Sequence, residues 1–130
     1  MATWDDVKTF IHGKFKAEDV TDGMIRMVFD VGDLRSQLVF LTREALMDGA
    51  EEWLVITSPF APCAGTDLQA ALDAASKLVC GSLAQVGNHL ALKHALPLTN
   101  VDHNEILRPI QLVTTSADRL ERELVGTDAL

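Results

Sequence analysis

Two histidines five positions apart, His89 and His94, stand in the otherwise apolar run HLALKHALPL. Imidazole nitrogens serve as metal ligands and general bases, so the pair raises the question of a metal or catalytic site. Side chains alternate along a strand, and positions of opposite parity point to opposite faces. A β-bulge would bring the rings together, but no third or fourth ligand stands nearby in the sequence. We therefore predict structural roles for both histidines and no metal site.

Four other side chains could act as nucleophiles: Ser58, Ser82, Cys63 and Cys80. None of them lies in a nucleophile elbow, a CxxC pair or beside a sequence-adjacent base. His103 stands next to Asp102 and before Glu105, which is typical of a helix-capping region. The glycine-rich phosphate loops GxGxxG and GxxxxGK are absent as well. The sequence predicts no catalytic residues, no cofactor and no enzyme, with two reduced thiols rather than a disulfide.

The composition narrows the class of partner. The 130-residue chain carries 19 acidic and 11 basic side chains, a formal net charge of −8. This charge repels phosphate backbones and anionic membranes, so neither nucleic acid nor membrane is an expected partner. The start, MATWDDVKTF, has acidic residues where a signal peptide needs a basic stretch, and no apolar run approaches a membrane span. We expect one cytoplasmic domain over residues 1–130.

The first half of the chain predicts a helix and three strands. Thr3 and Asp6 form a capping-box-like pair at the start of a helix over 3–16, whose apolar face is Trp4, Val7, Ile11 and Phe15. Residues 17–23 are polar and turn-prone. Two β-rich runs, 24–30 and 34–42, flank the short loop 30–33 and predict a hairpin. A third strand over 53–60 ends at Pro59 and Pro62.

The hairpin loop, counted as four residues, places Phe29 opposite Leu34 and fixes the faces of both strands. The predicted core face holds Ile25, Met27, Phe29, Leu34, Leu38 and Phe40. The opposite face then holds Arg26, Val28, Arg35, Gln37, Val39 and Leu41.

The second half predicts two helices around a hairpin. Gly65-Thr66-Asp67 opens a helix with the apolar stripe Leu68, Leu72, Ala75 and Val79, closed by Gly81. Strands over 82–86 and 89–96 flank the turn pair Gly87-Asn88. A long amphipathic helix follows from Asp102 and Glu105. Because proline disrupts a helix interior, the helix either bends at Pro109 or begins there after a short turn.

The order helix, three strands, helix, two strands, helix predicts an α+β fold with a five-stranded antiparallel sheet. With the ending LALKHALPLTNVDHNEILRPIQLV, the chain resembles the type III secretion chaperone-like superfamily, which includes the bacterial YbjN-like proteins. There the last strand ends in a similar LPL step, and a long helix with a similar apolar pattern follows. The matching positions are Leu96-Pro97-Leu98, Ile106-Leu107, Ile110, Ala117-Asp118 and Leu120-Glu121.

The resemblance implies a non-enzymatic homodimer that holds an extended segment of a client protein or secreted effector against apolar patches. The expected partner-binding surface is the outward face of the first three strands: Val28, Val39, Leu41, Trp53 and Val55. An apolar outer face is covered by the chain's own helices, a second subunit or a partner. The alternative function is a small-molecule sensor with a pocket between sheet and helices, marked by Ser36, Thr57 and His94.

Overall fold

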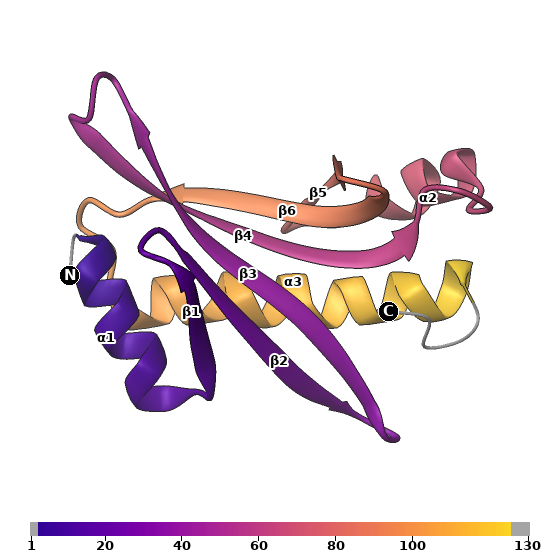
Figure 1. Ribbon diagram of the computed structural model, residues 1–130. Helices are drawn as coiled ribbons and strands as arrows, with labels where there is room; N and C mark the ends of the chain where they lie inside the picture. The colour runs from indigo at the N-terminus through magenta and orange to yellow at the C-terminus, as the bar shows by residue number, and fades with distance from the viewer. Residues whose placement is uncertain (1–2, 126–130) are drawn as a thin grey trace.

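The computed structural model describes residues 3–125 and has an α+β architecture, with three helices and an antiparallel sheet (Figure 1). The elements are α1 (Trp4–Lys14), β1 (Ala17–Thr21), β2 (Met24–Gly32), β3 (Arg35–Leu46), β4 (Glu51–Pro62), α2 (Leu68–Ala75), β5 (Ser82–Val86), β6 (His89–Pro97) and α3 (His103–Leu124). The strand order is β1-β2-β3-β4-β6-β5. β6 lies between β4 and β5, so α2 and its flanking loops carry the chain past the position of β6 to the sheet edge.

The helix starts follow the predicted capping chemistry. The Thr3 hydroxyl accepts a hydrogen bond from the Asp6 amide at 3.2 Å and begins α1. Asp102 and Glu105 form a reciprocal capping box at the start of α3. α3 then continues through Pro109 as one helix, which excludes the alternative in which the helix begins at this residue. Pro109 is the seventh residue of α3, beyond the first turn, so it removes one intrahelical hydrogen bond, the one to the Glu105 carbonyl.

The sheet has six strands rather than the predicted five. The additional strand is β1, in the stretch 17–23 that the sequence predicted to be a turn. β1 pairs with β2 through a two-residue connection, Asp22-Gly23, between the paired residues Thr21 and Met24. An Asp-Gly pair between two short runs is a recognised hairpin signal. The polar composition of β1 obscured it, because this edge strand is mostly exposed and buries little apolar surface.

The predicted register of the β2–β3 hairpin is wrong by three residues. Phe29 pairs with Gln37 rather than Leu34, and the turn consists of Asp33 and Leu34 alone, both with positive φ (51° and 61°), as in a type I′ turn. The register also shifts between Asp30 and Gly32. Because side chains alternate along a strand, an odd shift exchanges the two faces of β3.

The core face of the sheet is therefore the one that carries Gln37, Val39 and Leu41, together with Ile25 and Met27 from β2. Val39 and Leu41 are fully buried, whereas both were predicted to face outward. Leu34, Leu38 and Phe40 were predicted to lie in the core. Leu34 is instead fully exposed at the turn, and Leu38 and Phe40 lie half-buried on the opposite face.

All three helices lie on the core side of the sheet. α3 packs across β2, β3, β4 and β6, and Ile106, Ile110 and Val113 are fully buried beneath them. α1 lies beside the start of α3, where the Phe10 and His103 rings stack at 4.1 Å. α2 contacts α3 and β5. The core is thus a single layer between the helices and one sheet face (Figure 1).

The second helix is shorter than predicted. Asp67 caps it as expected, but α2 ends at Ala75, six residues before Gly81. The predicted apolar stripe does not face the core, because Leu68 and Leu72 are 55% and 46% exposed and Val79 is fully exposed beyond the helix. Ala71 is the residue that α2 buries completely. Its small side chain allows the backbone of α2 to approach its neighbours closely.

Candidate functional site

The sheet face opposite the helices, called here the outer face, is the candidate interaction surface. Its apolar members are Val28, Leu38, Phe40, Trp53, Val55 and Pro59. Val28 is 56% exposed, and Leu38, Phe40, Trp53 and Pro59 are half-buried. No helix of residues 3–125 packs on this face. An antiparallel sheet normally presents polar side chains to water there, so the apolar character is notable.

Of the predicted binding residues, the structure places Val28, Trp53 and Val55 on the outer face. Val55 is only 7% exposed, because its neighbours on the face surround it. Val39 and Leu41 belong to the core and cannot contact a partner. Their places are taken by Leu38 and Phe40, which the sequence assigned to the core because the turn was counted as a four-residue loop.

The sheet opens between β3 and β4 near one end. The two strands pair from Phe40–Thr57 to Leu46–Glu51, and beyond Phe40 and Thr57 they separate, as the diverging ribbons in Figure 1 show. Side chains bridge this separation. The Gln37 amide nitrogen donates to the Ser58 hydroxyl at 2.9 Å and to the Pro59 carbonyl at 2.8 Å. Ser58 in turn donates to the Leu38 carbonyl at 2.7 Å.

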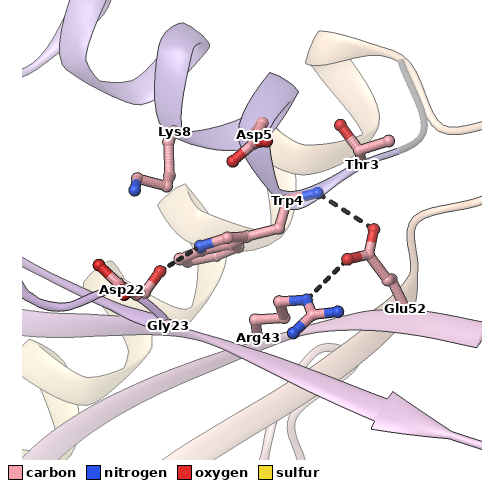
Figure 2. A pocket seen from close by; sticks show the side chains of 8 residues that line it. All are labelled: Thr3, Trp4, Asp5, Lys8, Asp22, Gly23, Arg43 and Glu52. Atoms are coloured by element: carbon pink, nitrogen blue, oxygen red, sulfur yellow. Dashed lines mark hydrogen bonds and ion pairs between the residues drawn. The ribbon is translucent and has the colours of Figure 1, made fainter. Parts of the chain in front are cut away.

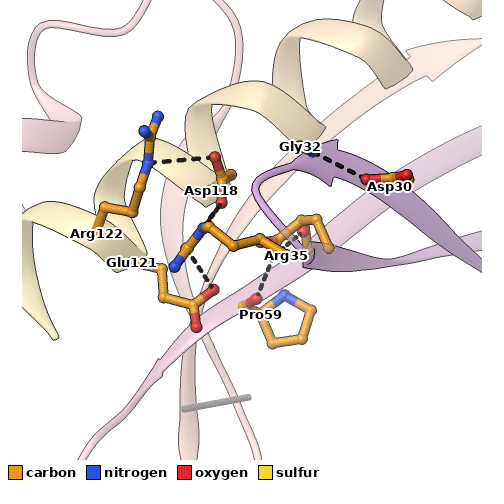
Figure 3. A network of polar contacts seen from close by, with 9 residues as sticks. Asp30, Gly32, Arg35, Pro59, Asp118, Glu121 and Arg122 are labelled. Atoms are coloured by element: carbon orange, nitrogen blue, oxygen red, sulfur yellow. Dashed lines mark hydrogen bonds and ion pairs between the residues drawn. The ribbon is translucent and has the colours of Figure 1, made fainter. Parts of the chain in front are cut away.

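An ion-pair network joins the separated end of β3 to α3 (Figure 3). The Arg35 Nη2 and Nε atoms donate to one carboxylate oxygen of Asp118, at 2.9 and 3.1 Å. Arg35 also lies 3.9 Å from Glu121, and Arg122 lies 3.4 Å from Asp118. The carboxylates are deeply buried, with side-chain exposures of 7% for Asp118 and 1% for Glu121. Two basic groups thus neutralise two acidic groups where the sheet lacks a continuous ladder.

Two hollows meet on the outer face around Arg26 and Val28. One, of about 220 Å³, lies at the β3–β4 separation and is lined by Arg26, Val28, Ser36, Gln37, Leu38, Pro59 and Glu121. The other, of about 530 Å³, extends toward β1 and is lined by Lys16, Ala17, Glu18, Arg26 and Val28. We call the first the split hollow and the second the edge hollow. The two hollows adjoin at Arg26 and Val28, which line both.

A separate pocket of about 590 Å³ lies beside the start of α1 (Figure 2). Its base is the buried Trp4 indole, whose Nε1 donates to the Asp22 carbonyl at 2.8 Å. Glu52 accepts from the Trp4 amide at 3.3 Å and from Arg43 at 2.6 Å. These bonds join α1 to β3 and β4 and satisfy an amide in the first turn of the helix. The hydrogen bonds of Trp4, Glu52 and Arg43 therefore have a structural role, since they hold α1 against the sheet.

The residues proposed for a ligand-sensing pocket do not converge. Ser36 and Thr57 share the outer face, whereas His94 pairs with Ile56 and lies on the core side. His89 lies on the opposite face of β6, as its parity predicted. Among the described residues, no three His, Cys, Asp or Glu side chains come together as a metal site. Burial raises the pKa of the Cys80 thiol, which disfavours the nucleophilic thiolate.

The exposed pair His12–Asp19 ties α1 to β1, with His12 Nε2 2.7 Å from an Asp19 carboxylate oxygen. The hydrogen bond to His12 holds the pKa of Asp19 below its ordinary value of 3.8. A depressed pKa means that folding favours the ionised form, so the stabilisation is present above pH 3.8 and disappears as the pH falls through the folded-state pKa.

We expect Asp19→Asn to lower the melting temperature slightly at neutral pH, because exposed ion pairs contribute little. The difference from the wild type should shrink as the pH falls below 3.8 and vanish once the folded-state carboxyl group is also protonated. Melting curves across this range measure it. An equal difference at every pH would show that the pair stabilises the fold in some other way.

Comparison of the sequence with models of known protein families and with curated proteins gives no match. The resemblance to the secretion chaperone-like superfamily therefore stays a prediction. Within the described part of the chain, no helix is both long and apolar enough to span a membrane.

Proposed function

We propose that the protein is a non-enzymatic, cytoplasmic protein-binding module that holds a segment of a client protein on its outer face, in the manner of a secretion chaperone. The observation that carries the proposal is the one-sided packing of the sheet. All described helices cover one face, and the other retains Val28, Leu38, Phe40 and Trp53 at least partly accessible. Burying such a surface against a partner is favourable by about 25 cal/mol per Å² of apolar area.

The face suits side-chain docking rather than strand addition. Its inner strands β2, β3, β4 and β6 each pair on both sides, so their backbone groups are mostly used within the sheet. The outer edges of the sheet belong to β1 and β5, which have only five residues each. The β3 edge that is unpaired beyond Phe40 is bridged to β4 by the Gln37 and Ser58 side chains. A client on the outer face would therefore bind mainly through apolar contacts, with hot spots where side chains enter hollows.

We also propose that the protein is a homodimer that associates through α2. Leu68 and Leu72 are one helical turn apart and stand exposed on the same side of α2. This position leaves the outer face accessible, because α2 packs against α3 and β5 at the end of the helical layer. Self-association and client binding then use separate surfaces.

The test is capture of partners from the native lysate, with the wild type and Phe40→Asp compared side by side. The control is Gln111→Asp, which adds the same charge at an exposed position of α3. We expect a partner that wild type and control both retain and that Phe40→Asp binds at least about tenfold more weakly, since binding would bury the unpaired carboxylate in an apolar contact. That partner is then purified and its affinity measured by calorimetry. Circular dichroism checks that each variant folds.

The proposal is rejected if Phe40→Asp retains every partner of the wild type, or if wild type recovers only itself. The second result would indicate that the outer face is covered by another copy of the chain. Light scattering separates this case, because Phe40→Asp would then lower the oligomeric state, whereas a dimer through α2 would respond to Leu72→Asp instead.

A further inference from the structure

The split hollow has a lining and a volume that suit the binding of one side chain. Val28, Leu38 and Pro59 supply apolar walls from three different strands, and Arg26 and Ser36 supply polar groups. Its volume, about 220 Å³, is below the range of about 300–1,000 Å³ typical of small-molecule pockets. This size suits an inserted side chain better than a whole metabolite.

Gln37 gives this hollow an unusual feature. The residue is only 2% exposed, and its Oε1 has no hydrogen-bond partner among the described residues. Rotating the amide by 180° would not help, because it would place Oε1 against the Pro59 carbonyl, which Nε2 contacts at 2.8 Å. A buried acceptor without a donor is destabilising, so a donor that satisfies it is favoured. Oε1 exposes less than 1 Å² of its own surface, so the Gln37 side chain must turn toward the hollow to accept a hydrogen bond from a bound group.

We propose that the split hollow receives a tyrosine side chain of the bound client segment. This inference rests on the proposed function and specifies what the client must contain. The apolar lining favours a side chain that is itself mostly apolar, and the Gln37 acceptor favours a side chain with a hydrogen-bond donor at its tip. A phenol combines the two, whereas indole carries its donor on the side of the ring.

Charge at the hollow agrees with a neutral phenol. The buried Glu121 carboxylate also lines the hollow and disfavours an anionic group at its base. Arg26 stands at the rim, where a guanidinium contributes a cation–π contact with an aromatic ring. The adjoining edge hollow gives the client main chain a path past Lys16 and Ala17 toward β1.

The composition of the chain excludes one occupant. The sequence contains no tyrosine, so a second copy of the protein cannot supply a phenol. The anchor must come from a different protein.

The test is an NMR titration of the full-length protein with three blocked peptides, Ac-Ser-Val-Xaa-Val-Ser-NH₂, in which Xaa is Tyr, Phe or Ala. We expect amide shifts centred on residues 26–28 and 36–38, and binding of the Tyr peptide about fivefold tighter than the Phe peptide, the effect of one hydrogen bond. The Ala peptide should bind at least about tenfold more weakly than the Tyr peptide, since it lacks the ring.

Three variants test whether the peptide side chain binds in the split hollow and contacts Gln37. Gln37→Leu removes the acceptor and should make the Tyr and Phe peptides bind equally. Ser36→Trp adds bulk at an exposed position lining the hollow and should abolish binding of both peptides, whereas Ser82→Trp, also exposed but on β5, should retain both affinities. If Gln37→Leu does not fold, the Ser36→Trp and Ser82→Trp pair still tests the location, and the Tyr–Phe difference tests the chemistry.

Equal binding of the Tyr and Phe peptides to the wild type, shifts centred elsewhere, or no binding would each overturn the inference. The titration is independent of partner capture. A Tyr preference without a captured client would support the hollow as a phenol site and reject the client role. A client lost by Phe40→Asp, together with no Tyr preference, would support the proposed function and reject the anchor.

Discussion

Replacing Arg35 with Met is expected to lower the free energy of unfolding by about 3–5 kcal/mol, the usual cost of leaving buried charge without its partner. Arg35 donates two hydrogen bonds to Asp118 and lies 3.9 Å from Glu121, and the side chains of both acids are less than a tenth exposed. The variant also loses the link between the β2–β3 hairpin and α3. For a domain whose whole stability is about 5–15 kcal/mol, such a loss is severe.

Urea unfolding, followed by circular dichroism, measures the effect. The matched control is Arg119→Met, which removes an arginine of α3 that pairs with Glu123. Both side chains are 53% exposed, so the change should cost less than about 0.5 kcal/mol. The double variant Arg35→Met, Asp118→Leu should recover part of the loss, because it removes a stranded charge as well. Similar costs for Arg35→Met and Arg119→Met would show that the network contributes little to stability.

Leu41→Ala is expected to cost about 2–5 kcal/mol of stability, whereas Leu38→Ala, three positions earlier in the same strand, should cost less than about 1.5 kcal/mol. Leu41 is fully buried in the core, where truncation leaves a cavity beside Ile25 and Ile56, its paired neighbours on β2 and β4. Leu38 is half-buried on the outer face, so the surface around it can adjust and water can fill the space.

The comparison measures the strand register directly, since the two leucines point to opposite faces. Urea unfolding of both variants under identical conditions gives the difference. A larger cost for Leu38→Ala than for Leu41→Ala would mean that β3 presents the opposite face to the helices. It would also remove Leu38 and Phe40 from the proposed client surface.

The sequence by itself determined much of the local structure. Side-chain capping by Thr3, Asp67 and Asp102 acts within three residues, and the structure has helices beginning after each of them. The Gly87-Asn88 turn likewise fixes the β5–β6 pairing, with positive φ at Gly87 and Val86 opposite His89. Such interactions are encoded in short segments, so their types and spacing suffice to predict them. The opposite orientations of His89 and His94 followed in the same way from strand parity.

The candidate site was only partly predictable. The sequence indicated an apolar outward face and correctly placed Val28, Trp53 and Val55 on it, but it exchanged Leu38 and Phe40 with Val39 and Leu41. All four are apolar, so neither face of β3 stands out by composition, and its register depended on a turn. The turn places Leu34 at a φ of 61°, a conformation that a leucine rarely adopts.

The tertiary structure alone decided which face is covered and where the sheet opens. The sequence offered no pattern for the separation of β3 from β4, because the side chains that bridge it come from distant parts of the chain. Gln37, Ser58, Arg35 and Asp118 acquire their roles only there, from positions up to 83 residues apart. The stretch predicted to be a turn forms the strand β1, because pairing with β2 gives its backbone groups hydrogen-bond partners at the sheet edge. Local chemistry therefore fixed where most helices and strands begin, and long-range packing fixed which side chains remain for a partner.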